Sequence, residues 1–257
     1  MRRILLAVTG AAVILTSAGS AFAAPGFEVG ARGAYWFPKL TGTARTTTNG
    51  VPETLLDVES TLGMKDENIP FGEAFLRLGG ATLRIGYTEL SFDGNRTLAD
   101  TVTFNGRTFA AADNVVSKLD MKMLDGELQI DFLRPDVALA NFNIGLLVKV
   151  KYVDGEMELR STLQPATTKD FKAPIPMIGL AAGVGALKDM VRVDARASGI
   201  AYSGNHLYDA DIYASLAPLP FLRIQGGYRH IDLKIDEDDA LASFKLSGPY
   251  IGAQLSF

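Results

Sequence analysis

The sequence predicts an all-β protein: a transmembrane antiparallel up-and-down β-barrel of about ten strands, with eight strands as the alternative. Three observations lead to this fold class. Apolar and polar residues alternate with a period of two through most of the chain, long and short connections alternate, and the chain stops on an aromatic residue, Phe257. A helical period of 3.6 residues is almost nowhere visible.

The N-terminus has the pattern of an export signal. Arg2 and Arg3 precede an apolar run, and Ala21-Phe22-Ala23 forms a small-x-small cleavage site. The apolar run has about 12 residues, whereas a spanning helix needs about 20, so a cleaved signal is favoured over a transmembrane anchor. We therefore expect residues 1–23 to be a signal peptide and residues 24–257 to form one outer-membrane β-barrel domain.

The composition excludes several classes of protein. The chain has 257 residues, no cysteine, two histidines and a formal net charge of −4. Without cysteine there is no disulfide scaffold, thiolate metal centre or lipoprotein anchor, and an acidic balance gives no footprint for nucleic acid. We expect no cofactor, no bound metal and no nucleic-acid partner.

The alternation is clearest from Phe142 to Tyr152, where the even positions are apolar and the odd positions are mostly polar. Leu124 to Phe132 and Val191 to Ala201 alternate in the same way. Each of these runs predicts a strand with one apolar face and one polar face that contacts water. The predicted strands cover residues 27–37, 71–79, 82–92, 118–133, 141–159, 173–187, 190–202, 206–217, 221–235 and 243–257.

The fourth and tenth predicted strands do not keep one phase throughout. Met121 and Met123 are out of step with Leu124 and Leu128. Phe244 is likewise out of step with Ile251 and Leu255. The sequence therefore predicts a bulge or a phase change in these two strands.

The connections alternate in length. The short ones contain turn-forming residues, as in Gly79-Gly80-Ala81 and Arg134-Pro135-Asp136. The longer ones run over residues 38–70, 93–117, 160–172 and 236–242. An antiparallel meander with an even number of strands brings both termini to the short-turn end, which is the periplasmic end of an outer-membrane barrel.

The apolar face could contact lipid or fill the core of a soluble, lipocalin-like barrel. A charged, glycine-rich opposite face and aromatic residues near the strand ends favour lipid. Glycines such as Gly183 and Gly185 would leave room in a narrow lumen for long charged side chains. The residues expected to line that lumen are Glu73, Arg77, Arg84, Glu127, Asp131, Lys149, Lys151, Arg192, Asp194, Arg196, Asp209, Asp211 and Arg223.

The last nine residues, Pro249 to Phe257, alternate and end without a tail. This segment resembles the C-terminal signature of outer-membrane β-barrel proteins. Trp36-Phe37-Pro38, Leu62 to Asn68 and Val102 to Phe109 resemble elements of small, uncharacterised proteobacterial outer-membrane barrels of the porin-like, single-chain type. The resemblance implies a barrel fold and a location in the cell outer membrane of a Gram-negative bacterium. We expect a monomer in contact with outer-membrane lipid and lipopolysaccharide. The resemblance also implies recognition of the strand ending at Phe257 by the barrel-assembly machinery.

The two histidines are the candidates for catalysis. Omptin-type surface proteases also have ten strands, but they need paired aspartates facing an Asp-x-His arrangement, and His206 near Asp209 or His230 near Asp232 differs in order and spacing. A His–Ser pair of the lipid A deacylase type would have to use His206 with Ser198 or Ser203. We expect rim histidines that hydrogen-bond loops, no catalytic residues and no enzyme activity.

Two further segments could have a function. The acidic run Asp236-Glu237-Asp238-Asp239 lacks the spacing of a calcium loop, so a solvated loop is expected. Thr54 to Leu62 could form a short helix, acting as a surface flap or a plug.

The expected function is that of a structural or small-solute pore protein with a charge-lined, mostly occluded lumen. The alternatives are a surface adhesion or ligand-binding barrel acting through loops 38–70 and 93–117, and a rim-located hydrolase.

Overall fold

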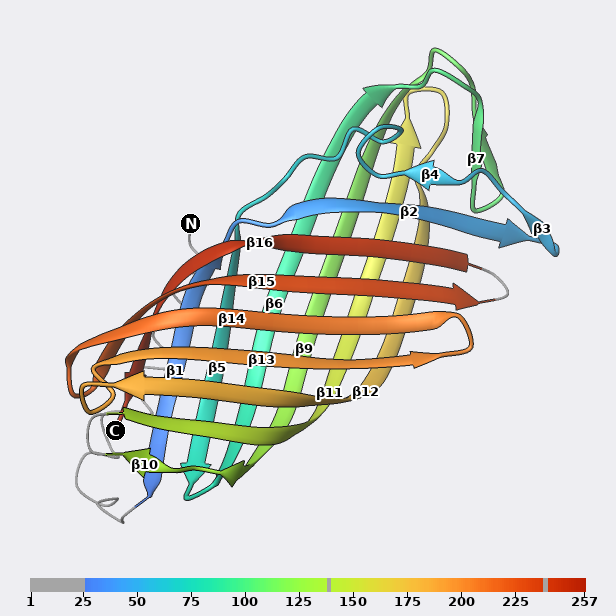
Figure 1. The fold of residues 1–257 in the computed structure, drawn as a ribbon. Helices are drawn as coiled ribbons and strands as arrows, with labels where there is room; N and C mark the ends of the chain where they lie inside the picture. Colours follow the sequence, from blue (N-terminus) through green and yellow to red (C-terminus); the bar gives the residue numbers. More distant parts are fainter. Residues whose placement is uncertain (1–25, 138–139, 238–239) are drawn as a thin grey trace.

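The computed structural model describes residues 26–137, 140–237 and 240–257. Ten antiparallel strands close into a barrel, which confirms the predicted fold class (Figure 1). The predicted signal peptide lies outside the described residues. Around the wall the strands are β1 (Phe27–Trp36), β5 (Ile69–Leu78), β6 (Ala81–Thr97), β9 (Asn114–Leu133), β11 (Ala140–Ser161), β12 (Thr167–Ala186), β13 (Val191–Tyr202), β14 (Asn205–Leu219), β15 (Leu222–Glu237) and β16 (Ala240–Ser256).

Each predicted strand overlaps one strand of this barrel, although several strands are longer than predicted at the long-loop end. For example, β9 begins at Asn114 and β12 at Thr167. The long connections are correspondingly shorter than expected. None of the described residues forms a helix long and apolar enough to cross a bilayer.

The barrel closes between the first and the last strand. β1 pairs with β16 from Gly30↔Ser256 to Trp36↔Tyr250, and β2 (Lys39–Thr48) continues along the same strand from Lys39↔Ser247 to Thr46↔Ala240. The sequence had predicted a loop here, because the segment KLTGTARTTT has almost no apolar alternation. It forms a strand because its backbone groups hydrogen-bond to those of β16. Of its side chains, only those of Leu40, Ala44 and Thr46 are buried.

The remainder of the first loop fills the wall between β2 and β6. β4 (Leu56–Asp57) pairs with β2, a single bridge joins Met64 to Gly94 of β6, and β3 (Val51–Pro52) forms a short hairpin with the end of β2. The helix considered for Thr54 to Leu62 is not formed. A strand and a turn take its place, with Leu56 and Val58 both buried on the inner side.

Two smaller elements complete the fold. β7 (Val102–Phe104) and β8 (Arg107–Phe109) form a separate hairpin within the second long loop, and β10 (Asp136–Val137) pairs with the start of β11. The hairpin turn contains Asn105 and Gly106, both with positive φ, as a two-residue Asn-Gly turn requires.

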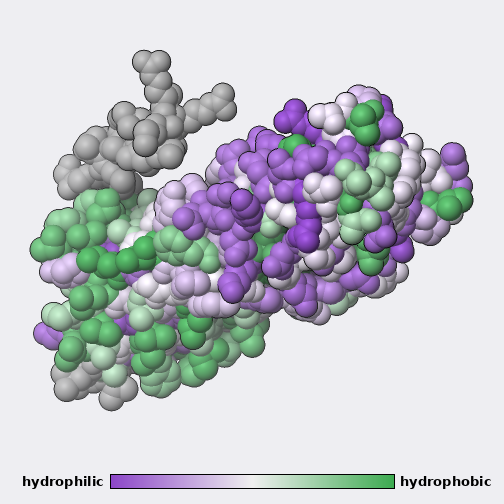
Figure 2. Space-filling model, turned by 90° about the horizontal axis from the view of Figure 1, so that it is seen from above, coloured by the Kyte–Doolittle hydropathy of each residue, from purple (hydrophilic) through white to green (hydrophobic). Residues whose placement is uncertain are grey.

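The polarity of the two barrel faces inverts halfway along the strands. On β9, the outward residues Leu124 and Leu128 are exposed while Asp125 and Glu127 are buried inside. Towards Asn114, the inward residues become apolar, as Leu119 is, and the outward residues become polar. Figure 2 shows the result: hydrophobic side chains gather over the end that holds both termini, and hydrophilic side chains cover the opposite end.

The predicted phase change is therefore present, but no bulge accompanies it; the one register shift of β9 against β11 lies near Phe132, at the short-turn end. β9 pairs with β6 in unbroken register from Ile130 to Asn114, and β16 pairs with β15 without a shift. The backbone keeps its alternation. What changes is the solvent outside the wall, from lipid to water, and the apolar side chains change face accordingly. We call these two parts the membrane half and the outer half.

Aromatic side chains mark both edges of the apolar band, which is the arrangement of the interfacial girdles in outer-membrane barrels. On four strands an outward tyrosine is the last apolar residue before the outer half begins: Tyr87, Tyr152, Tyr208 and Tyr228, each between 40% and 48% exposed. At the short-turn end lie Phe132, Phe142, Phe221 and Phe257.

Candidate functional site

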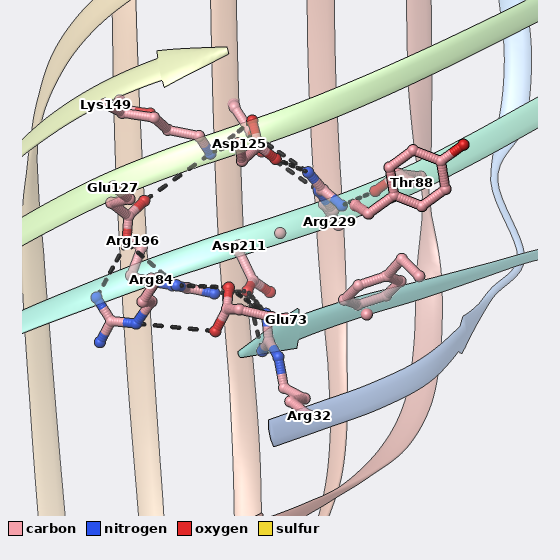
Figure 3. A pocket seen from close by; sticks show the side chains of 16 residues that line it. Arg32, Glu73, Arg84, Thr88, Asp125, Glu127, Lys149, Arg196, Asp211 and Arg229 are labelled. Atoms are coloured by element: carbon pink, nitrogen blue, oxygen red, sulfur yellow. Dashed lines mark hydrogen bonds and ion pairs between the residues drawn. The ribbon is translucent and has the colours of Figure 1, made fainter. Parts of the chain in front are cut away.

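Charged side chains from nearly every strand of the membrane half meet inside the barrel (Figure 3). Eight of the predicted lumen residues join this group, together with three that were not predicted. We call the group the lumen cluster: Arg32, Glu73, Arg84, Asp125, Glu127, Lys149, Lys151, Arg196, Asp209, Asp211 and Arg229. Six are basic and five acidic, so the charges nearly balance.

One part of the lumen cluster is organised around two aspartates. The Asp209 carboxylate lies 2.7 Å from Lys149 Nζ, 3.1 Å from Lys151 Nζ and 3.2 Å from Arg229 Nη2. Asp125 lies 2.6 Å from Lys151 Nζ and 3.6 Å from Arg229 Nη2. Lys151 is 0% exposed, so this ammonium group depends wholly on its carboxylate neighbours.

The other part is organised around Arg196. Its guanidinium lies 3.1 Å from Glu73, 3.2 Å from Glu127 and 3.0 Å from Asp211. Arg84 is 3.0 Å from Glu127. A contact of 3.8 Å between Lys149 and Glu127 connects the two parts. The result is a continuous network rather than a set of separate pairs.

Aromatic rings lie around the Arg32 and Arg229 guanidinium groups of the cluster. The guanidinium of Arg32 lies 5.1 Å from the ring centre of Tyr213, and that of Arg229 lies 5.4 Å from Trp36 and 5.3 Å from Phe71. Tyr250 donates a 2.7 Å hydrogen bond to Asp211 Oδ1. These contacts hold the cations against the rings and restrict their rotation.

Little space remains within the lumen cluster. The cavity between its side chains has a volume of about 30 Å³, enough for one or two water molecules. A hydrated ion or a small metabolite does not fit. The layer of ion pairs therefore closes the membrane half in this conformation.

The remaining predicted lumen residues lie nearer the short turns. Arg77, Asp131, Arg192, Asp194 and Arg223 all line an open cavity of about 360 Å³, which we call the periplasmic vestibule. Its polar side chains are tied mostly to one another, although Arg84 and Arg196 of the lumen cluster also line it and Arg84 donates to Gln129 Oε1 at 2.8 Å. Arg192 Nε donates to Asp194 at 2.8 Å, Arg223 donates to the backbone carbonyl of Asp189 at 2.8 Å, and Arg77 pairs with Glu28 at 2.8 Å.

Glycine makes room for these side chains, as the sequence indicated. A Cβ at Gly183 would lie 2.2 Å from Arg192 Nη2 and 2.3 Å from Asp194 Oδ1. A Cβ at Gly185 would lie 2.0 Å from Asp189 Oδ1. Larger residues at these positions would displace the vestibule charges.

The interior of the outer half is apolar and covered. Phe92, Leu119 and Val153 are fully buried inside the wall, and Phe104 and Phe109 of the β7–β8 hairpin are buried with them. The hairpin is fastened at its tip. Asn105 N–H donates to Thr46 Oγ1 at 2.8 Å, its side-chain amide donates to the carbonyl of Thr168 at 2.9 Å, and Gly106 N–H donates to Glu53 Oε1 at 2.8 Å.

We call these hydrogen bonds at the tip of the β7–β8 hairpin the hairpin latch, and Glu53 is its acidic residue. Burial raises the pKa of its carboxyl group, but hydrogen bonds from Thr46, Thr48 and the Gly106 N–H lower the pKa by more. The net pKa is below the ordinary value, so the carboxylate is ionised at neutral pH.

The two histidines lie on the outward face of the wall, next to the tyrosine girdle. His206 Nε2 is 3.2 Å from Asp232 Oδ1 and its ring stacks on Tyr208, while His230 Nδ1 is 2.6 Å from Ser247 Oγ. Ser198 is buried on the inner face and Ser203 lies in the β13–β14 turn, so neither contacts His206 through a hydrogen bond in the described part of the chain. Asp238 and Asp239 of the acidic run lie outside the described residues.

Three cluster residues were missed by the sequence analysis: Arg32, Asp125 and Arg229. A usable signal was present. Arg229 is separated from Arg223 on β15 by an even number of positions, and so is Asp125 from Glu127 on β9. Residues an even number of positions apart point to the same face of a strand, so Arg229 and Asp125 were both expected to face inward. Arg32 is harder to find, because the glycines and alanines around it hide the alternation of β1.

Comparison with known proteins leaves the function open. No family model matches the chain, and no curated protein matches it in sequence. The outer membrane protease OmpT of Escherichia coli superposes with a TM-score of 0.53 at 10% identity, over 93% of this chain and 99% of that one. The attachment invasion locus protein Ail of Yersinia pestis gives 0.35 at 9% identity, over 90% and 99%. Neisserial surface protein A gives 0.32 at 12% identity, over 90% and 97%.

At these identities the likeness concerns the fold alone. The apolar band with its two girdles, closed around a charged interior, decides where this fold resides. The chain is an outer-membrane β-barrel. In this outer-membrane barrel, the membrane half contains the ion pairs and lies in the lipid. The outer half has an apolar core and lies outside the lipid.

Proposed function

We propose that this outer-membrane barrel is occluded and is not an open solute channel. We further propose that it is a binding protein and that its outer half binds the ligand. The observation behind the first part is the lumen cluster, whose ion pairs leave a cavity of only about 30 Å³. Unpaired charges in this position would be costly, so the closed network is the stable arrangement.

The second part rests on how the long loops are used. Residues 38–70 and 93–117 contribute β2, β4 and the β7–β8 hairpin, which pack around a buried apolar core instead of extending freely. A barrel that served only to fill the membrane would not need such a structure outside it. Ordered loops on a rigid wall are a common basis for binding.

The proposal includes no enzymatic activity. His206 and His230 are each hydrogen-bonded on the outward face, and among the described residues their side-chain partners are Asp232 and Ser247. It also includes contact with outer-membrane lipid and lipopolysaccharide, recognition of the C-terminal strand ending at Phe257 by the barrel-assembly machinery, and a monomeric state.

Planar-bilayer recording tests the occluded state. Protein whose fold is verified by heat-modifiable migration on a gel is expected to insert without steady unitary conductance. Deletion of residues 102–109 should leave the bilayer silent too, because the lumen cluster closes the barrel independently of the hairpin. Steady conductance of the unmodified protein would overturn the proposal, and conductance of the deletion variant alone would show that the hairpin, not the ion pairs, forms the seal.

A further inference from the structure

We infer that the outer half contains a binding site for a small uncharged apolar molecule, about the size of one or two aromatic rings, at the free edge of β12. The inference deepens the proposed binding role and rests on it. Three features lead to it: an interrupted strand pairing, an apolar cavity behind the interruption, and a set of small residues that keeps this cavity open.

The pairing of β12 is one-sided in the outer half. Its ladder with β11 is continuous from Thr167 to Ala186, but its ladder with β13 begins only at Ile178↔Gly199. Figure 1 shows the consequence, since β12 descends steeply through the outer half and then bends to run beside β13. On the side that faces β13, residues 167–177 therefore form no β-ladder with a described strand, although the Asn105 side chain donates to the carbonyl of Thr168.

Two prolines explain where the ladder stops. Pro174 and Pro176 have no N–H group, yet their pairing with Tyr152 and Val150 of β11 is intact. The missing donors must therefore belong to the opposite edge, which faces β13. A third strand could not pair there without leaving its carbonyl groups unsatisfied. The two prolines therefore prevent regular strand pairing along this edge of β12.

A cavity of about 220 Å³ lies behind this opening. Its inner lining is apolar and comes from β11, β12, β15, β16 and the β7–β8 hairpin, through Met157, Phe171, Ile235, Phe244 and Phe104. The lining also includes outward residues at the edges, Lys172 on β12 and Leu241 on β16, so the cavity reaches the outer surface. It has a route for entry from outside the membrane.

Small residues keep the cavity open. Ala44, Ala173, Ala240 and Ala242 line it, whereas neighbouring inward positions such as Phe244 bear large side chains. Most protein interiors are close-packed, so these small side chains set the volume of the cavity. An engineered apolar cavity of about 150 Å³ is known to bind benzene, so 220 Å³ suits a slightly larger molecule.

The rim favours an uncharged ligand. Arg45, Lys169 and Lys172 lie there with Asp170, so charges of both signs surround the mouth. Lys172 is already paired with Asp154 at 3.3 Å. Met157 and Phe171 form an apolar inner wall, so burying an ionic ligand against that wall would cost its hydration.

Methyl NMR on protein labelled at methionine and held in lipid nanodiscs tests the inference, with benzene as the probe. Met157 lines the cavity, whereas Met190 is half exposed in the β12–β13 turn at the other end and reports non-specific contact with benzene. Met157 should shift and saturate at concentrations where the Met190 shift is still linear. A Met157 response that is absent, or that merely parallels Met190, overturns the inference.

Filling the cavity provides the matched comparison. Ala242→Phe and, from the opposite wall, Ala173→Phe should each reduce the saturable Met157 response at least tenfold. Ala214→Phe, which adds the same ring on the outward face of β14, should leave it unchanged. Heat-modifiable migration identifies any variant that fails to fold, and the second cavity variant then replaces it. Saturable binding that survives both fillings contradicts the site, whereas silent bilayers would still support the occluded barrel.

Discussion

The two halves of the barrel use the same strands in opposite ways. In the membrane half, inward residues such as Glu127 and Lys149 are charged and outward residues such as Leu128 and Val148 are apolar. In the outer half, Leu119 points inward and Lys118 outward. The strand geometry is identical, so the difference teaches that the surrounding solvent, not the backbone, selects the residue type for each face.

The two halves are also stabilised by different forces. The membrane half relies on a network in which every carboxylate contacts more than one cation, as Asp209 does with Lys149, Lys151 and Arg229. The outer half relies on apolar burial under a hydrogen-bonded hairpin. If this contrast is correct, equivalent substitutions in the two halves must give different results.

The largest effect is expected from Asp209→Ala. It leaves three cations in the lumen with fewer carboxylates, and breaking a buried pair costs about 3–5 kcal/mol. The free energy of unfolding in urea, followed by heat-modifiable migration, measures the loss. Asp154→Ala is the control, because its pair with Lys172 is exposed and such pairs contribute about 0–1 kcal/mol. Equal losses in the two variants would refute the importance of the network.

A leucine pair on β9 gives the next largest difference. Leu119 is 0% exposed inside the outer half, so Leu119→Ala should create a cavity and cost about 2–5 kcal/mol. Leu124→Ala changes an outward side chain that is 49% exposed next to the tyrosine girdle, where lipid tails can fill the space. Its loss in the same urea experiment should be clearly smaller, and a reversed order would mean that the two faces of β9 are wrongly assigned.

The smallest effect concerns the hairpin latch. The pKa of Glu53 is lowered in the folded protein, so its stabilising contribution is complete above the pKa of the unfolded chain and is lost as the pH falls through the lower, folded value. Acidification below about pH 4 should therefore loosen residues 102–109. Hydrogen exchange of these amides measures the opening. Glu53→Gln should remove most of this pH dependence at a cost of about 1–3 kcal/mol, while strands of the membrane half remain protected.

Much of the fold could be predicted from the sequence, because alternation in a segment such as Phe142 to Tyr152 reports a wall with one apolar face. It could not show that the apolar face switches sides, so Met121, Met123 and Phe244 suggested a bulge that is absent. β2 was missed for another reason. Its residues are nearly all polar, and its strand pairing depends on β16, about 200 residues later in the chain.

The candidate site was predictable in kind more than in detail. Parity identified residues that face inward, such as Glu127 and Arg196, but parity says nothing about height along the barrel. Arg192 and Arg196 therefore looked equivalent, although one lines the vestibule and the other lies at the centre of the lumen cluster. The cavity behind β12 was not foreseen either, since it requires knowing which edge of Pro174 and Pro176 lacks a partner.

The lumen cluster has a consequence for how the protein can be assembled. Its members come from eight of the ten strands, and Arg32 on β1 reaches Asp211 on β14 only after the ring has closed. A half-inserted intermediate would therefore expose isolated charges to hydrocarbon. Membrane insertion, ring closure and neutralisation of these charges should occur as one all-or-none event, with no stable partial barrel along the way.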